Sequence, residues 1–193
     1  MKKVFAIVAL VAAMFVAGNV QAQTTIHAGY APETFSSSTG SETYQGFFVG
    51  LTQNFGLAKG FGVAAGAQFR MNMKSQTVLG TTTKATQTLI DIPVLFNYEI
   101  GINRDLSVTP FVGPMLTLAL TGNTKVGSFD PINWYGEYGN RNRLNLNAVF
   151  GANVRFTQFN LFGGYRLGLL DQDKSDNFKM TTSGFFIGLG YTL

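Results

Sequence analysis

Five charged residues stand at alternate positions inside segments that are otherwise apolar or small. They are Arg70, Asp91, Glu99, Arg155 and Arg166. Charges of both signs that are withdrawn from water must pair with one another, so this set predicts a buried network of ion pairs and hydrogen bonds. The same alternate positions carry amides that extend the network, namely Gln68, Asn97, Asn147 and Asn153.

Catalytic chemistry has few candidates in this chain. It has no cysteine, which excludes thiol nucleophiles and thiolate metal sites, and one histidine, His27. His27 falls early in the first predicted strand, where a packed histidine is favoured over a general base. No nucleophile–base pair, phosphate-binding loop or metal-ligand spacing is present in the sequence. We therefore expect no enzyme, no metal and no cofactor.

The charged positions lie on segments whose hydrophobicity alternates with a period of two, which indicates strands. The clear segments are 44–54, 61–72, 90–100, 106–120, 145–156, 159–170 and 184–193, with a weaker one at 24–34. The sequence thus predicts eight antiparallel strands. Pro93, Pro110 and Pro114 predict a bulge or local distortion, because proline removes a ladder hydrogen bond.

The two faces of these strands differ in a way that indicates a lipid-facing exterior. The apolar face of the clear strands carries no charged residue, whereas the opposite face is rich in glycine, asparagine and threonine. Charged residues make up 12% of the chain, well below the usual share of roughly 25%. We predict an all-β fold, an eight-stranded up-and-down transmembrane barrel whose lumen is filled by side chains. A structural plug is favoured over a conduction path.

The N-terminus has the pattern of a signal peptide, residues 1–22. Lys2 and Lys3 precede an apolar run over 4–18, and Val20-Gln21-Ala22 is a small-x-small cleavage site. A membrane anchor is the alternative, but the run is short for a spanning helix. Residues 23–193 form the predicted barrel domain. Without the two lysines, the 14 basic residues fall to 12 against 10 acidic ones, so no nucleic-acid partner is expected.

The connections between the predicted strands alternate in length. Short ones fall at 56–60, 101–105 and 157–158, and long ones at 35–43, 73–86, 121–143 and 171–180. An even number of strands puts both termini at the short end. That end is periplasmic in bacterial outer-membrane barrels, so the long loops are expected outside the cell.

Aromatic residues of the apolar face collect near the short end of the strands. They are Phe55, Phe61, Tyr98, Phe156, Phe159 and Tyr191. Such clustering is typical of a girdle at a membrane–water interface. The alternative is that aromatics simply favour strands.

The longest predicted loop, 121–143, combines aromatic and cationic residues. They are Lys125, Phe129, Trp134, Tyr135, Tyr138, Arg141 and Arg143. This combination suits binding of a surface protein, a glycan or a lipopolysaccharide phosphate. Equally, the aromatic residues could cap the mouth of the barrel or lie at the lipid headgroups.

Four segments carry a resemblance to a known family: LIDIPVLFNYEI (89–100), TPFVGPMLTL (109–118), GGYRLGLLD (163–171) and FFIGLGYTL (185–193). The chain resembles the small outer-membrane barrels of the OmpX and OmpA superfamily, and more closely the PorT-like barrel family. The resemblance implies outer-membrane lipid and lipopolysaccharide as surroundings. It also implies recognition by the barrel-insertion machinery through Gly188, Tyr191 and Leu193.

The expected role is envelope integrity or surface interaction through the external loops. Three alternatives stay open: a lipid-modifying enzyme, a narrow channel, and the secretion-accessory role that PorT-like membership would allow.

Overall fold

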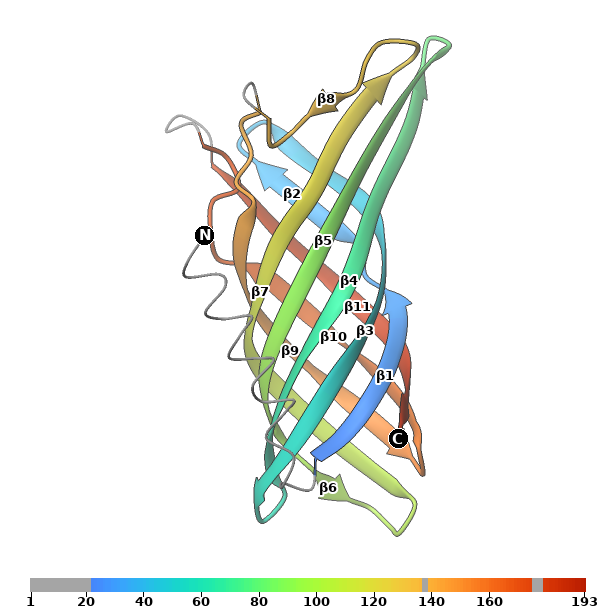
Figure 1. Ribbon diagram of the computed structural model, residues 1–193, viewed down its shortest axis with the longest axis vertical. Helices are drawn as coiled ribbons and strands as arrows, with labels where there is room; N and C mark the ends of the chain where they lie inside the picture. The colour runs from blue at the N-terminus through green and yellow to red at the C-terminus, as the bar shows by residue number, and fades with distance from the viewer. Residues whose placement is uncertain (1–21, 137–138, 175–178) are drawn as a thin grey trace.

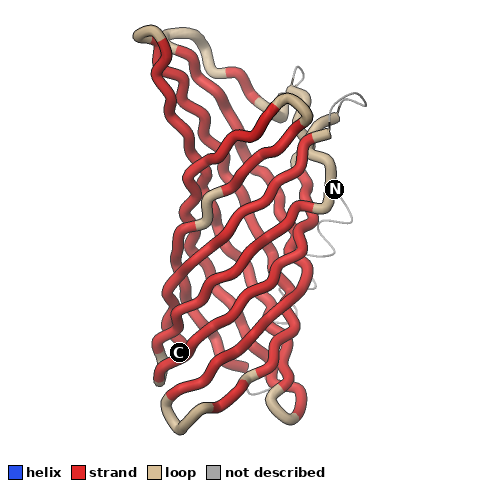
Figure 2. Tube along the Cα trace, turned by 180° about the vertical axis from the view of Figure 1, so that it is seen from behind, coloured by secondary structure: helices blue, strands red, loops and turns tan. Residues whose placement is uncertain are grey.

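The computed structural model describes residues 22–136, 139–174 and 179–193. Figures 1 and 2 show tilted strands that wrap around a common axis. The predicted signal peptide lies outside the described residues, apart from Ala22. Among the residues described, no helix is long and apolar enough to cross a bilayer. The strands are β1 (Ala22–Tyr30), β2 (Glu33–Ser37), β3 (Gly40–Ala58), β4 (Phe61–Val78), β5 (Thr81–Tyr98), β6 (Ile100–Gly101), β7 (Leu106–Val126), β8 (Ile132–Asn133), β9 (Leu144–Phe156), β10 (Phe159–Gly168) and β11 (Met180–Thr192).

The sheet closes on itself as a ring of eight antiparallel strands. The order around the ring is β1, β3, β4, β5, β7, β9, β10 and β11. Closure comes from β1, which pairs with β11 from Thr25↔Thr192 to Tyr30↔Ile187 and with β3 on its other side. The predicted closure of the first strand onto the last is confirmed. A closed ring leaves no unpaired edge along the paired stretch.

The first strand of the ring is made of two pieces. β2 continues the course of β1 and pairs with the same neighbours, β11 and β3. The interruption falls at Ala31–Pro32, where proline cannot donate to the ladder. Two main-chain carbonyls are thereby released from strand pairing into the interior, where they become acceptors for a side chain described below.

Alternate residues face outward and inward, as the period of two predicts. Phe47, Val49 and Leu51 of β3 are each about half exposed, whereas Arg70 and Asp91 have 0% of their surface exposed. The apolar side chains therefore cover the outside of the ring, and the charged ones lie in its lumen. This is the reverse of the arrangement in a water-soluble barrel.

The two ends of the cylinder differ. At the turn end, the strands are joined at 59–60, 102–105 and 157–158, and the C-terminus lies there too (Figure 1). At the loop end, the connections are 38–39, 79–80, 127–143 and 169–179. In Lys59-Gly60 and in Leu79-Gly80, each of the two residues has a positive φ. This is the conformation of a two-residue hairpin turn whose twist matches that of the flanking strands. The predicted short links are confirmed at one common end.

Two of the predicted long loops are wrong, because the strands continue through them. Segment 35–43 is a hairpin of β2 and β3, and segment 73–86 is the outer part of the β4–β5 hairpin. Segment 73–86 holds five threonines, which favour extended backbone, and segment 35–43 holds two threonines among four serines. Thr77 and Thr82 bond across the strands at 3.0 Å between their hydroxyls, and Thr34 and Thr43 do so at 2.9 Å. With the outer part of β7, the β4–β5 hairpin makes a sheet that projects beyond the ring (Figure 1).

The prolines of the interior strands do not shift the register. The β5–β7 ladder skips from Pro93↔Met115 to Phe96↔Val112 and then resumes in the same register. The register shift of these strands lies instead between Thr88 and Leu89. Of the expected bulge or local distortion, the structure has the local distortion, an interruption of the ladder without a bulge.

Candidate functional site

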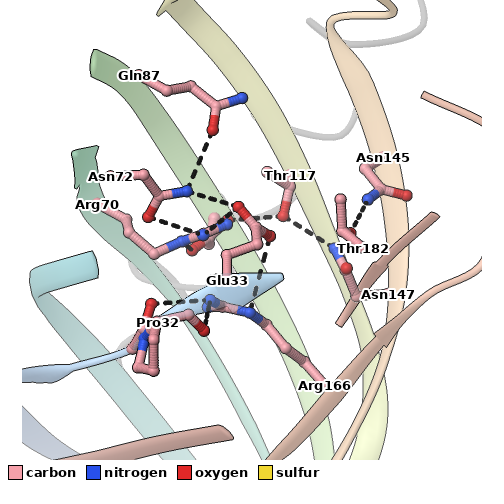
Figure 3. A network of polar contacts seen from close by, with 12 residues as sticks. Pro32, Glu33, Arg70, Asn72, Gln87, Thr117, Asn145, Asn147, Arg166 and Thr182 are labelled. Carbon is pink, nitrogen blue, oxygen red and sulfur yellow. Dashed lines mark hydrogen bonds and ion pairs between the residues drawn. The ribbon is translucent and has the colours of Figure 1, made fainter. Parts of the chain in front are cut away.

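Four charged side chains meet in the centre of the lumen (Figure 3). They are Glu33 of β2, Arg70 of β4, Asp91 of β5 and Arg166 of β10. None of their side chains is more than 5% exposed. Two positive and two negative groups balance, so the cluster carries no net charge. We call these four residues the plug quartet.

Arg70 is the centre of the quartet. Its Nε donates to Oδ2 of Asp91 at 2.8 Å and its Nη2 donates to Oδ1 at 3.2 Å. The remaining nitrogen, Nη1, donates to Oε2 of Glu33 at 2.9 Å. A planar guanidinium suits this arrangement, because its fork matches the two oxygens of one carboxylate and still reaches a second acid.

Neutral groups complete the bonding of Asp91. Thr117 donates to its Oδ1 at 2.6 Å, and Gln68 donates to its Oδ2 at 3.0 Å. Asn147 in turn donates to the Thr117 hydroxyl at 2.9 Å. Asp91 thus accepts from two strands besides its own, β4 and β7, which offsets the cost of burying its charge.

A second set of contacts joins the quartet to the loop end. Asn72 donates to Oε2 of Glu33 at 2.5 Å and to Oε1 of Gln87 at 3.1 Å. Gln87 donates to the Tyr135 hydroxyl at 2.6 Å. Burial raises the pKa of Tyr135, although the bond from Gln87 opposes that shift. The chain of contacts therefore runs from the middle of the lumen to the loop between β8 and β9.

Arg166 donates hydrogen bonds to the main chain at the interruption between β1 and β2. Its Nη2 donates to the carbonyls of Ala31 at 3.0 Å and Pro32 at 3.2 Å (Figure 3). Its Nε lies 3.9 Å from Oε1 of Glu33, too far for a hydrogen bond. Of the polar atoms in the ranges that the structure describes, this Nε is one of the few that are buried without a partner.

The predicted lumen residues form two groups. Gln68, Arg70, Asp91, Asn147 and Arg166 belong to the plug or its shell. The other group lies nearer the turn end, where Arg155 pairs with Glu99 and donates to Oε1 of Gln23 at 2.7 Å. The remaining bonds of this group are Asn97 to Asn54 at 2.8 Å and Asn153 to Asn160 at 3.0 Å. The sequence did not single out Glu33, Asn72, Gln87 or Thr117.

A cavity of about 180 Å³ separates the plug from the turn end. Its wall includes Arg166 at the deep side, and Glu99 and Arg155 toward the turn end. The expectation that side chains fill the whole lumen is therefore wrong for this half. Glycines at inward positions leave the space open, since they contribute no side chain.

The loop 127–143 folds over the mouth of the cylinder. Trp134 and Tyr135 are each 8% exposed and pack with Phe35 and Tyr44 of the β2–β3 hairpin. Trp134 Nε1 donates to the Thr124 hydroxyl at 2.8 Å. These rings occupy the interior at the loop end rather than presenting a surface for a partner.

The arginines of this loop stack on the same rings. The guanidinium of Arg141 lies 4.0 Å from the centre of the Trp134 ring, and that of Arg143 lies 4.9 Å from the Tyr135 ring. Phe129, in contrast, is 76% exposed, and Lys125 is exposed as well. Tyr138 lies outside the described residues. Of the two interpretations of this loop, the capping of the mouth fits the geometry of Trp134 and Tyr135.

His27 lies in the lumen between two aromatic rings. The ring centres of Phe48 and Phe162 are 5.9 and 5.6 Å from that of His27, and the Thr52 hydroxyl lies 3.4 Å from Nδ1. Within residues 22–136, 139–174 and 179–193, no three acidic or histidine side chains are grouped to hold a metal ion.

The comparison with known families decides the class of this chain. A family model described as an outer membrane protein β-barrel domain matches residues 12–174. The chain belongs to this family of outer-membrane β-barrels. The ring of eight strands is accordingly the barrel of an outer-membrane protein. The PorT-like branch stays a prediction, since the matched family is broader.

Solved outer-membrane barrels share the fold. Neisserial surface protein A is 16% identical with a TM-score of 0.51, over 87% of this chain and 96% of that one. The attachment invasion locus protein Ail of Yersinia pestis, solved with the heparin analogue sucrose octasulfate, is 16% identical with a TM-score of 0.50. The match covers 89% of this chain and 99% of Ail. No curated protein gives a significant match.

Aromatic residues ring the turn end of the barrel. The ring centres of Phe61 and Tyr98 are 4.7 Å apart, and those of Phe159 and Tyr191 are 5.4 Å apart. Phe156 pairs with Phe159 in the β9–β10 ladder and is exposed. The remaining girdle candidate, Phe55, is partly buried and pairs with Val63.

The predicted insertion signal lies on the last strand of the barrel. Gly188 pairs with Phe162, the Tyr191 hydroxyl donates to Gln158 Oε1 at 2.5 Å, and Leu193 is exposed. Tyr191 and Leu193 are thus at the turn end, where the strand terminates. Their recognition by the insertion machinery stays a prediction.

Proposed function

We propose that this protein is an integral, non-conducting outer-membrane barrel that acts at its loop end, in contact with lipopolysaccharide and with surface partners. Its termini are periplasmic and its projecting sheet is extracellular. The role is envelope integrity or surface interaction, without catalysis. The plug quartet and the covering loop support the absence of a conduction path, since they cross the lumen at two levels.

The projecting sheet provides the interaction surface. The β3–β4 ladder ends at Gln45↔Met73, but β4 and β5 remain paired up to Val78↔Thr81. The outer part of β7 joins them up to Thr83↔Val126. Val78, Leu79, Phe129 and Ile132 are exposed apolar residues of this region. Exposed apolar side chains that rise above the membrane level are suited to contact with another molecule.

One pair of lysines carries the proposal. Lys84 of β5 and Lys125 of β7 are direct partners in the ladder, so their side chains emerge side by side on one face. Trp134 bonds to Thr124 on the inner face, so Lys125 points outward. Among the described residues, neither lysine forms a salt bridge.

Like charges placed directly opposite each other destabilise a strand pair, and an anion between them removes that repulsion. The face that bears Lys84 and Lys125 is continuous with the lipid-facing face of β5 and β7, so the pair lies just above the apolar band of the barrel. Phosphate groups of lipopolysaccharide would occupy that level.

Replacing both lysines by glutamine is expected to weaken the binding of lipopolysaccharide about 5-fold per lysine. Each cation near an anionic surface contributes roughly 1 kcal/mol, and that energy corresponds to this change in affinity. Binding is measured as the shift in thermal unfolding when lipopolysaccharide is titrated into the purified barrel in detergent. Added salt should reduce the binding of the unaltered protein more than that of the variant.

The matched control removes two positive charges at the opposite end, as Lys59→Gln with Arg104→Gln. Both residues are exposed at the turn end. The control is expected to bind lipopolysaccharide as the unaltered protein does. If both double variants lose affinity equally, general charge attraction explains the binding and the assignment of the loop end fails.

The alternatives have less support. His27, the only histidine, lies between Phe48 and Phe162 in the lumen and away from the lipid-facing surface. That position favours packing over attack on a lipid. A channel would require an open path past the plug quartet. No residue described above supports a secretion-accessory role specifically.

A further inference from the structure

The cavity in the turn-end half of the lumen has an aromatic wall. Phe48, Phe111, Phe162 and Phe186 all line it. Their ring centres follow one another at 6.0 Å from Phe48 to Phe162, 6.4 Å from Phe162 to Phe186 and 6.3 Å from Phe186 to Phe111. His27 contacts the first two rings and extends the wall to β1.

Each of these rings lies over a glycine. The directly paired residues in the ladders are Phe48↔Gly29, Phe111↔Gly151, Phe162↔Gly188 and Phe186↔Gly164. A Cβ placed on any of the four glycines would come within 2.7 Å of the tip of the ring opposite. The rings therefore lie flat along the wall instead of crossing the lumen, and the space along the barrel axis is left open.

The deep side of the cavity presents a hydrogen-bond donor. Arg166 lines it with a side chain that is 2% exposed. Its Nε is fully buried beside Glu33 and its Nη2 bonds to the carbonyls of Ala31 and Pro32, whereas its Nη1 donates no hydrogen bond among the described residues. A buried N–H without a partner costs about 1–3 kcal/mol, which an acceptor on a bound molecule would recover. The plug quartet is already neutral, so an uncharged acceptor is preferred over a carboxylate.

The volume limits the size of the ligand. An apolar protein cavity of about 150 Å³ binds benzene. At about 180 Å³, this cavity has room for one six-membered ring with a small substituent. Flat aromatic walls favour an aromatic ring in offset or edge-to-face contact.

We propose that the cavity binds a small monocyclic aromatic molecule with one uncharged hydrogen-bond acceptor, which faces Arg166. The ligand enters from the turn end, because the plug closes the other side. Glu99 and Arg155 stand at that entrance with side chains 36% and 24% exposed. A second cavity of about 220 Å³ at the β3–β4 turn shares Asn54, Asn97 and Glu99 with the first.

The test uses phenol as the probe and benzene as its apolar analogue. Each is titrated into the purified full-length barrel in detergent, and binding is followed by saturation-transfer NMR and calorimetry. Saturable binding of phenol, about 5-fold tighter than that of benzene, is expected for one additional hydrogen bond. Empty micelles of the same detergent give the partition background.

Cavity-filling variants identify the site. Ala64 lines the cavity, and Ala64→Leu should weaken phenol binding at least 10-fold. Ala67→Leu, three residues along β4 on the exposed outer face, should leave binding unchanged. Thr109→Leu, on the wall formed by β7, provides a second filling variant if Ala64→Leu does not fold.

Two results would overturn the proposal. One is phenol uptake that is no greater than partition into empty micelles, which would indicate a cavity that holds only water. The other is equal affinity in the filled variants and the Ala67→Leu control, which would place the bound phenol elsewhere.

Discussion

Replacing Arg70 by methionine is expected to lower the free energy of unfolding of the barrel by about 3–5 kcal/mol. The substitution removes the donor of both bonds to Asp91 and of the bond to Glu33. Two buried carboxylates then share the single charge of Arg166. The measurement is denaturant unfolding of the protein in phospholipid vesicles, followed by the mobility of the folded barrel on gels without heating.

The control for this variant is Arg104→Met. Arg104 is exposed in the turn between β6 and β7, so its loss is expected to change stability by less than about 0.5 kcal/mol. A double variant, Arg70→Met with Asp91→Leu, leaves one acid and one base in the plug quartet, Glu33 and Arg166. It should regain about 2 kcal/mol relative to the single variant. A single variant as stable as Arg104→Met would show that the plug quartet does not hold the lumen together.

The closed ring could be predicted because the residue types alternate along each strand between a face toward lipid and a face toward the interior. Along a strand that separates lipid from a narrow interior, large apolar residues must alternate with glycine or polar residues. Arg70 and Asp91 stand at the polar parity in strands that are otherwise unmistakable. Their burial therefore followed from the pattern of their own segments.

The role of Glu33 and the full extent of the strands could not be predicted from the alternation of residue types. Glu33 shares the inward parity of His27, but it lies beyond the break at Ala31–Pro32, where alternation is weak. Its role depends on Arg70 and Arg166 reaching it from β4 and β10. The extent of the strands was also underestimated, because the threonine-rich segment 73–86 is polar on both faces.

The cavity illustrates the same limit. Eight strands enclose an interior that side chains are just able to fill, so the strand number predicts a filled lumen. What the sequence does not give is the register, which sets Phe162 directly against Gly188 and Phe111 against Gly151. Because each ring lies over a glycine of the neighbouring strand, it lies along the wall and does not extend across the lumen. The space along the barrel axis therefore stays open.

The outer face of the barrel gives the second large prediction. Ile187 lies on β11 between Phe185 and Tyr191 and is 50% exposed. If this face is in the hydrocarbon of the membrane, Ile187→Arg is expected to cost about 2–4 kcal/mol of folding stability in vesicles, the cost of an arginine near the bilayer midplane of a barrel. No contact within the lumen is changed by this substitution, so the cost reports on the lipid alone.

The matched control places the same arginine at an exposed position outside the predicted membrane level. Leu79, in the β4–β5 turn of the projecting sheet, is 101% exposed, and Leu79→Arg is expected to cost no more than about 1 kcal/mol. Both variants replace an exposed aliphatic side chain, so a difference between them measures depth in the bilayer rather than lost packing. Equal and small costs at the two positions would mean that the apolar band around Ile187 is not in lipid, which would remove the basis for a membrane-spanning barrel.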